Sequence, residues 1–203
     1  MITIVDYGMG NVGSIRNMLK KIGAEAEISG DATRIRAASK LILPGVGAFD
    51  AGMANLHASG LVPLLNERVV SAKVPVLGIC LGMQLMAHHS SEGLRHGLGW
   101  IDAEVRRLKP ANPALKVPHM GWSPVRPLRS APLIDDLPDE PRFYFVHSYF
   151  IDCRDAGDVL LETRYGEPFA SAVQHANIWG VQFHPEKSHR YGMHLLRNCA
   201  SRC

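Results

Sequence analysis

The sequence predicts an α/β fold: a mostly parallel sheet flanked by helices, with antiparallel strands added in its second half. Three observations predict this fold. Short apolar strands alternate with helical patterns through the N-terminal half, strand-like segments dominate the C-terminal half, and glycine-rich turns follow several of the strands. The chain has 203 residues, and a globular domain has roughly 150 residues. We therefore expect residues 1–203 to form a single domain.

The N-terminal half is expected to supply the parallel part of the sheet. The runs of strand length are Ile2–Val5, Ala24–Ile28, Leu41–Leu43 and Val76–Ile79. The stretches expected to be helical are Asn11–Lys21, Asp50–Ser59, Leu61–Ala72 and Gly82–His89. Parallel strands need a crossover between them, usually a helix, so this alternation predicts parallel pairing.

The C-terminal half changes character, because strand-like segments there follow one another with only turn residues between them. These segments are Ile101–Leu108, Phe143–Ile151, Val159–Thr163, Ser171–Gln174 and Ile178–Phe183. Strands joined by short turns pair in antiparallel fashion, so we expect them at the edge of the sheet. Ser188–Cys199 is expected to close the chain as a helix.

Composition excludes several classes of function. The 22 basic residues exceed the 19 acidic residues by only three, and the adjacent basic pairs are limited to Lys20–Lys21 and Arg106–Arg107. This is not the basic stripe of a nucleic-acid-binding protein. No apolar stretch approaches the ~18 residues of a membrane span. The N-terminal apolar run is too short for a signal peptide, so we expect a cytoplasmic location, where the four cysteines stay reduced. They are Cys80, Cys153, Cys199 and Cys203.

The first glycine-rich corner permits two interpretations. Residues Gly8–Gly13 fit the pattern G-x-G-x-x-G between an expected strand and helix, and Asp31 lies further along the chain. That arrangement is typical of dinucleotide-binding proteins. A tight strand-to-helix turn explains the same glycines, and it is the interpretation that we favour because so short a pattern occurs often by chance.

The second and third corners indicate a nucleophile with oxyanion donors. Gly45, Val46 and Gly47 follow a buried strand, where backbone N–H groups can point at a ligand. Gly78–Gly82 reads G-x-C-x-G, the cysteine form of the nucleophile elbow, with Cys80 between strand and helix. The N–H of Leu81 can then donate to an oxyanion, as can the Val46 loop.

His184 is the expected base for this thiol. It ends a predicted strand, and Glu186 lies two residues further, so that both side chains point to one side of an extended chain. Glu186 can therefore orient the imidazole toward Cys80. A thiol, a base and a carboxylate that orients the base are the groups of an acyl-transfer enzyme. A metal site of His184 with His175 or His189 is disfavoured by the spacing. We expect no metal and no cofactor.

These motifs resemble the class I, or triad, glutamine amidotransferases. The resemblance extends to one branch, the glutaminase subunits of imidazole glycerol phosphate synthase in histidine biosynthesis. The stretches that carry it are Asp6–Asn11, Pro44–Phe49, Gly78–Gln84, His119–Trp122, Tyr144–Tyr149 and His184–Ser188. They span nearly the whole chain, and their combination is specific although no single stretch is.

The resemblance implies hydrolysis of L-glutamine to glutamate and ammonia by the triad Cys80, His184 and Glu186. It also implies that the ammonia passes to a (β/α)8-barrel cyclase subunit bound as a heterodimer, which makes imidazole glycerol phosphate and an aminoimidazole carboxamide ribonucleotide. By analogy, the glutamine pocket is lined by Gly45, Gly47, Gln84, Ser148 and Tyr149. The residues expected to face the partner are Asn11, Trp122, Tyr144 and Lys187.

Two positions depart from the family pattern, namely Ser123, where we expect asparagine, and Ser14, near a usual asparagine. Both concern the docking surface rather than the triad. Rival hypotheses are the glutaminase of another synthase, such as anthranilate or aminodeoxychorismate synthase, an NAD-dependent oxidoreductase, and a binding module without activity. Lys187 argues against the glutaminase of another synthase, because those enzymes usually carry serine after His-Pro-Glu.

Overall fold

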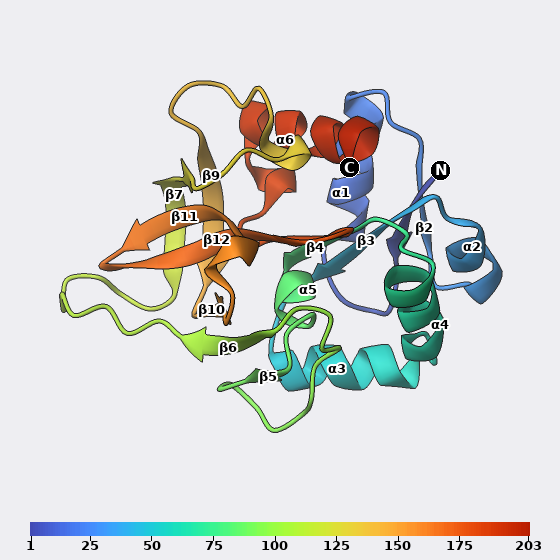
Figure 1. Ribbon diagram of the computed structural model, residues 1–203, viewed down its shortest axis with the longest axis horizontal. Helices are drawn as coiled ribbons and strands as arrows, with labels where there is room; N and C mark the ends of the chain where they lie inside the picture. Colours follow the sequence, from blue (N-terminus) through green and yellow to red (C-terminus); the bar gives the residue numbers. More distant parts are fainter.

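The computed structural model describes residues 1–203 and is built on an 11-stranded mixed sheet (Figure 1). Five parallel strands form its core, in the order β2 (Ala26–Ser29), β1 (Ile2–Val5), β3 (Lys40–Gly45), β4 (Val76–Cys80) and β13 (Ile178–Val181). Every residue of the last four is buried. Strands buried along their whole length need cover on both faces of the sheet, which the helices provide.

Antiparallel strands continue the sheet beyond β13. They are β12 (Glu167–His175), β10 (Tyr149–Cys153) and β6 (Ala103–Arg107), with the short β5 (His89–Ser90) parallel to β6. Strand β12 also pairs with β11 (Val159–Tyr165), which in turn pairs with β8 (Arg126–Pro127). A separate two-stranded antiparallel sheet consists of β7 (His119–Pro124) and β9 (Arg142–His147).

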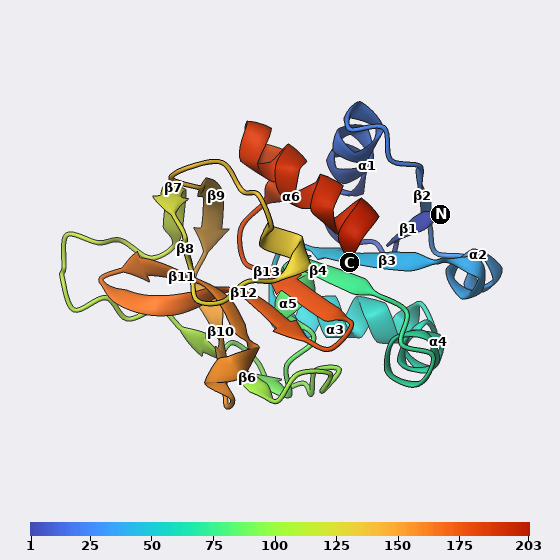
Figure 2. The ribbon, with the colours of Figure 1, turned by 45° about the horizontal axis from the view of Figure 1, so that its top comes forward.

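Helices cover both faces of the parallel core (Figures 1 and 2). On one face lie α1 (Val12–Lys21) and α6 (His189–Arg202), and on the other α3 (Phe49–Ala58), α4 (Val62–Asn66) and α5 (Leu81–Gln84). The short α2 (Ala32–Ala37) follows β2, and a π-helical turn, Glu67–Ser71, continues α4. Single 3-10 turns lie at Pro132–Ile134, Ala156–Asp158 and Pro185–Lys187. Each face of the sheet buries its own apolar cluster.

The predicted fold class is confirmed, and four details of the prediction are wrong. The segment Phe143–Ile151 forms two strands in two different sheets, with Ser148 between them. The helix expected over Gly82–His89 ends at Gln84, and Leu61–Ala72 divides into α4 and the π-helical turn. Ile178–Phe183, expected at the edge, instead supplies β13, which lies between β4 and β12 and is parallel to β4.

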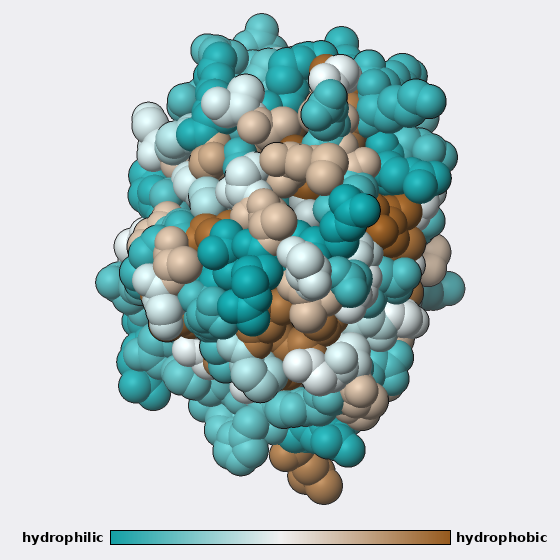
Figure 3. Space-filling model, turned by 90° about the vertical axis from the view of Figure 1, so that its right-hand side faces the viewer, coloured by the Kyte–Doolittle hydropathy of each residue, from teal (hydrophilic) through white to brown (hydrophobic).

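The surface at the β2 edge is mostly hydrophilic, with apolar side chains gathered only in small groups (Figure 3). No helix combines the length and apolar character needed to cross a membrane. All four cysteines are free thiols, two of them buried and two partly exposed.

Candidate active site

Cys80 occupies a strained turn at the end of β4, as the nucleophile elbow predicts. Its φ is 53° and its ψ is −112°, a conformation that costs energy for any residue with a side chain. Two glycines make the turn possible. A Cβ on Gly82 would lie 1.8 Å from the carbonyl oxygen of Leu43, and one on Gly78 would lie 2.7 Å from the backbone nitrogen of Met83. Cys80 is 7% exposed, at the floor of a cavity.

The second glycine corner lies beside the elbow. Gly45 is paired in register with Cys80 across the parallel strands β3 and β4. A Cβ on Gly45 would lie 2.8 Å from the backbone nitrogen of Gly82, so that the two corners are in backbone contact. The buried hydroxyl of Tyr7 donates a hydrogen bond of 2.6 Å to the carbonyl of Pro44 and supports the loop from below.

The two residues predicted to supply oxyanion donors, Val46 and Leu81, line the same cavity as Cys80. Leu81 begins α5, and the first N–H groups of a helix have no partner within the helix. Val46 and Gly47 follow Gly45 and line the same cavity as Cys80. The site therefore combines a nucleophile with the backbone groups that can stabilise an oxyanion.

His184 and Glu186 lie together in the interior, as predicted. His184 Nδ1 donates to Glu186 Oε1 at 2.9 Å, and the two side chains are 2% and 1% exposed. The buried Ser188 holds this segment, because its hydroxyl donates to the carbonyl of His184 and accepts from the N–H of Tyr144. The backbone of this segment is thereby held by Ser188, and the imidazole is held at Nδ1 by Glu186.

The charge of the site favours a protonated His184. Burial lowers the pKa of His184, but its interactions with the Cys80 thiol and the Glu186 carboxylate outweigh burial and raise the pKa to about 9. Nε2 of His184 is buried without a hydrogen-bond partner. It is thus free to exchange a proton with a nucleophile or a leaving group.

Two glutamines beside the thiol form a hydrogen-bond network, of which only Gln84 was predicted. The amide nitrogen of Gln84 donates to the carbonyl of Tyr149 and to the amide oxygen of Gln182, each at 2.9 Å. The amide nitrogen of Gln182 lies 3.6 Å from Cys80 Sγ. A buried N–H donor near a thiolate stabilises its negative charge. Gln182 lies two residues before His184, which is the signal that could have identified it.

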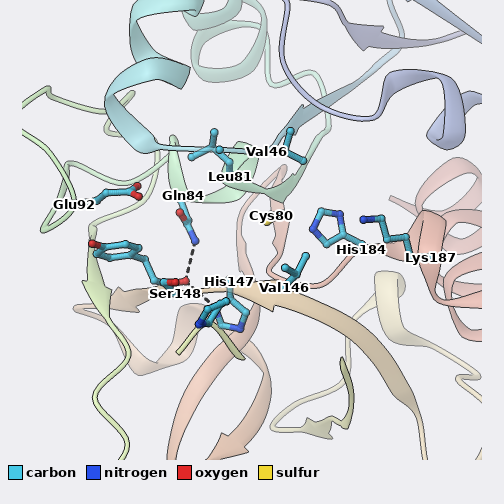
Figure 4. Close-up of a pocket in the computed structure, with 13 residues that line it drawn as sticks. Val46, Cys80, Leu81, Gln84, Glu92, Val146, His147, Ser148, His184 and Lys187 are labelled. Carbon is cyan, nitrogen blue, oxygen red and sulfur yellow. Dashed lines mark hydrogen bonds between the residues drawn. The ribbon is translucent and has the colours of Figure 1, made fainter. Parts of the chain in front are cut away.

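One cavity of about 420 Å³ collects most of the predicted residues (Figure 4). Those that line it are Val46, Gly47, Cys80, Leu81, Gln84, Ser148, Tyr149, His184 and Lys187. Gly45 and Glu186 do not line the cavity but contact residues that do, since Gly45 packs against Leu81 and Glu186 is hydrogen-bonded to His184. Four further lining residues were not predicted, namely Glu92, Pro118, Val146 and His147. Val146 and His147 lie within the stretch Tyr144–Tyr149 on β9, whereas no motif marks Glu92 and Pro118, which come from loops.

Three of the four residues predicted to face a partner, Trp122, Tyr144 and Lys187, lie together at one surface, and the fourth, Asn11, precedes a neighbouring helix. Trp122 is 43% exposed and makes an edge-to-face contact with Tyr144, with ring centroids 6.3 Å apart. Lys187 Nζ lies 5.8 Å from the centre of the Tyr144 ring. Asn11 is exposed at the start of α1, which packs against the turn that carries Lys187. Lys187 also lines the cavity, so this surface borders the cavity mouth.

The first glycine corner is a tight turn, as the favoured interpretation holds. Gly8 and Gly10 have φ of 81° and 92°, and a Cβ on Gly10 would lie 2.9 Å from Pro44 Cβ. Asp31, the acidic residue of the dinucleotide pattern, uses its carboxylate to cap α2 through the N–H groups of Thr33 and Arg34. His175, considered above as a metal ligand, is instead paired with Asp158.

Comparison with known proteins agrees with this geometry. The family model of class I glutamine amidotransferases matches residues 3–203. A Methanococcus maripaludis protein named imidazole glycerol phosphate synthase subunit HisH 2 is 54% identical over 98% of both chains. A Pseudomonas aeruginosa protein of the same name is 50% identical over 98% of both. A crystal structure described as a glutamine amidotransferase superposes with a TM-score of 0.75 at 19% identity and covers 98% of each chain.

Proposed function

This chain belongs to the class I glutamine amidotransferases, and we propose that it is the glutaminase subunit of an imidazole glycerol phosphate synthase in histidine biosynthesis. The observation that carries the chemistry is the cavity that Cys80 and His184 both line, with Glu186 hydrogen-bonded to His184 behind it. The relatives that match over their full length support the synthase. An NAD-dependent oxidoreductase, the rival from another enzyme class, would leave both the elbow and the His-Pro-Glu segment unexplained.

Cys80 attacks the side-chain carbonyl of glutamine, and the proton of its thiol passes to His184 Nε2. The Sγ–C bond forms, and the oxyanion is held by the N–H groups of Val46 and Leu81. His184 Nε2 donates its proton to the leaving nitrogen, the C–N bond breaks, and ammonia leaves a thioester on Cys80. His184 then accepts a proton from water, which attacks the thioester and releases glutamate. Glu186 holds the imidazolium throughout through Nδ1.

The cavity also carries groups that fit the rest of the substrate. Glu92 lines it, and a carboxylate is the group that attracts the α-ammonium of an amino acid. The amide nitrogen of Gln84 is used by Tyr149 and Gln182, which leaves the amide oxygen of Gln84 for the ligand. Ser148 and Gly47 complete the lining.

The ammonia must reach a second subunit before water protonates it. We place the partner, a (β/α)8-barrel cyclase bound as a heterodimer, on the surface of Trp122, Tyr144, Lys187 and Asn11, which borders the cavity mouth. The reduced thiols are consistent with a location in the cytoplasm.

The test is a glutaminase assay of the purified chain with and without the cyclase subunit and its nucleotide ligand. We expect strong stimulation by the complex, and loss of glutamine use but not of ammonia-dependent synthesis in Cys80→Ala. The matched control is Cys153→Ala, which alters a partly exposed thiol outside the cavity. If stimulation came from an anthranilate synthase large subunit instead, the synthase assignment would be wrong. Loss of ammonia-dependent synthesis in Cys80→Ala would contradict the division of labour.

A further inference from the structure

Two buried histidines connect strand β7 to the wall of the cavity. His119 and His147 are cross-strand partners in the β7–β9 sheet, and they are 1% and 6% exposed. His119 Nδ1 lies 3.1 Å from His147 Nε2, His119 Nε2 lies 2.8 Å from Ser123 Oγ, and His147 Nδ1 lies 2.8 Å from the carbonyl oxygen of Tyr149. Together with Ser123, the histidines form a chain of hydrogen bonds, here called the histidine relay, that ends on the carbonyl of Tyr149 in the proposed glutamine pocket.

The proton positions in this histidine relay follow from the group at its end, the carbonyl of Tyr149. Burial lowers the pKa of His119 to about 4 and that of His147 to about 3, so both rings are neutral near pH 7. A carbonyl only accepts, so Nδ1 of His147 carries the hydrogen and Nε2 accepts. Nδ1 of His119 must then donate, and its Nε2 must accept from the hydroxyl of Ser123. A single assignment of the ring hydrogens therefore gives every ring nitrogen of the two histidines a hydrogen-bond partner.

The carbonyl of Tyr149 joins this chain to the amides of the active site. It accepts from His147 and also from the amide nitrogen of Gln84, which in turn donates to Gln182. A carbonyl has two lone pairs, and both are used here. The orientation of the Gln84 amide in the cavity therefore depends on where His147 holds this carbonyl.

Strand β7 presents this chain on its inner face and the proposed docking surface on its outer face. His119 is buried and Ser123 half-buried, whereas Met120 and Trp122 between them are 62% and 43% exposed. The rings of Phe145 and Tyr165 stack on His119, with centroids 4.8 Å and 4.1 Å away. The His119 ring therefore has little freedom to turn independently of the strand.

We propose that His147 and His119, anchored by Ser123, are positioning residues that hold the Tyr149 carbonyl and thereby orient Gln84 for glutamine. This rests on the proposed function, because it concerns the pocket for that substrate. The relay also gives a role to Ser123, where the family pattern leads us to expect asparagine. A serine hydroxyl supplies the donor that Nε2 of His119 requires.

The kinetic test uses two variants of His147, each of which removes one of its two hydrogen bonds, at Nε2 or at Nδ1. An asparagine places its amide N–H where Nδ1 lies, so His147→Asn keeps the bond to the Tyr149 carbonyl. A glutamine reaches the position of Nε2 instead, so His147→Gln loses that bond. We expect His147→Gln to raise the KM for glutamine about tenfold, the size of one lost hydrogen bond, at nearly unchanged kcat. The KM of His147→Asn should stay close to the wild-type value.

The alkylation rate of Cys80 by iodoacetamide is the control for a damaged site, and it should be the same in all three proteins. Equal KM values in the wild type and His147→Gln, with normal turnover, would overturn the positioning role alone. Absence of glutamine turnover by the wild-type chain with its cyclase would overturn the proposed function itself.

The proton arrangement is tested independently of glutamine by ¹⁵N NMR of the histidine rings. We expect hydrogen on Nδ1 of both His119 and His147, and a mixture of tautomers at His119 in Ser123→Ala. Hydrogen on Nε2 of His147 in the wild-type protein would refute the relay.

Discussion

Replacement of Glu186 by glutamine tests how the site holds a positive charge on His184. The two side chains are 1% and 2% exposed and share a hydrogen bond of 2.9 Å. Such a charged hydrogen bond contributes roughly 1.5–3 kcal/mol. At 1.36 kcal/mol per unit this corresponds to about 1–2 pKa units. The amide oxygen of glutamine can still accept from Nδ1 but carries no charge, so the pKa of His184 should fall from about 9 to between about 7 and 8.

The consequence for stability follows from the direction of the shift. The folded pKa of His184, about 9, exceeds its ordinary value of 6.5. Protonation of His184 therefore stabilises the folded state fully below pH 6.5, and this contribution disappears as the pH rises through 9. Glu186→Gln should be less stable than the wild type by about 1–3 kcal/mol below pH 6.5. The difference should shrink toward pH 9.

Two measurements check this prediction. NMR titration of the His184 ring gives its pKa in both proteins, and urea unfolding between pH 6 and 9 gives the stability difference. The control is Glu167→Gln, which alters an exposed carboxylate on β12. An unchanged pKa of His184, or a stability difference that grows toward pH 9, would show that Glu186 does not hold the imidazolium.

Two further predictions concern the elbow and the substrate pocket. Gly82→Ala should lower the free energy of unfolding by about 4 kcal/mol or more, because its Cβ meets the Leu43 carbonyl, whereas Gly13→Ala in α1 should raise it by up to about 1 kcal/mol. Similar effects in urea denaturation would contradict the steric explanation. Glu92→Gln should raise the KM for glutamine by tenfold or more, about the value of a charged hydrogen bond, while the amide oxygen keeps the bond from the Phe49 N–H. An unchanged KM in initial-rate kinetics would remove Glu92 from substrate binding.

Short-range features of the site were predictable because local geometry determines them. The flanking glycines of Cys80 are required by the close approach of strand and helix, and the i, i+2 spacing of His184 and Glu186 brings their side chains together. Both patterns operate over a few residues of chain, so they do not depend on how the sheet is ordered.

The errors arose where tertiary hydrogen bonds override local preference. The helix expected over Gly82–His89 stops early because the carbonyls of Leu85, Met86 and Ala87 accept from residues 98–100. The segment Phe143–Ile151 breaks at Ser148 because its halves pair with different strands, β7 and β6. Partners so distant in sequence leave no periodic signal within the segment itself.

The sequence by itself determined the α/β class and predicted the candidate nucleophile, its base and the two glycine corners, since each depends on local sterics or on alternation along the chain. Only the tertiary structure decided what surrounds them. Glu92 and His147 reach the cavity, and Gln182 reaches the thiol, because the sheet order brings remote segments to the end of β4. A binding pocket is a product of packing between segments, and its walls therefore appear only when those segments are in place.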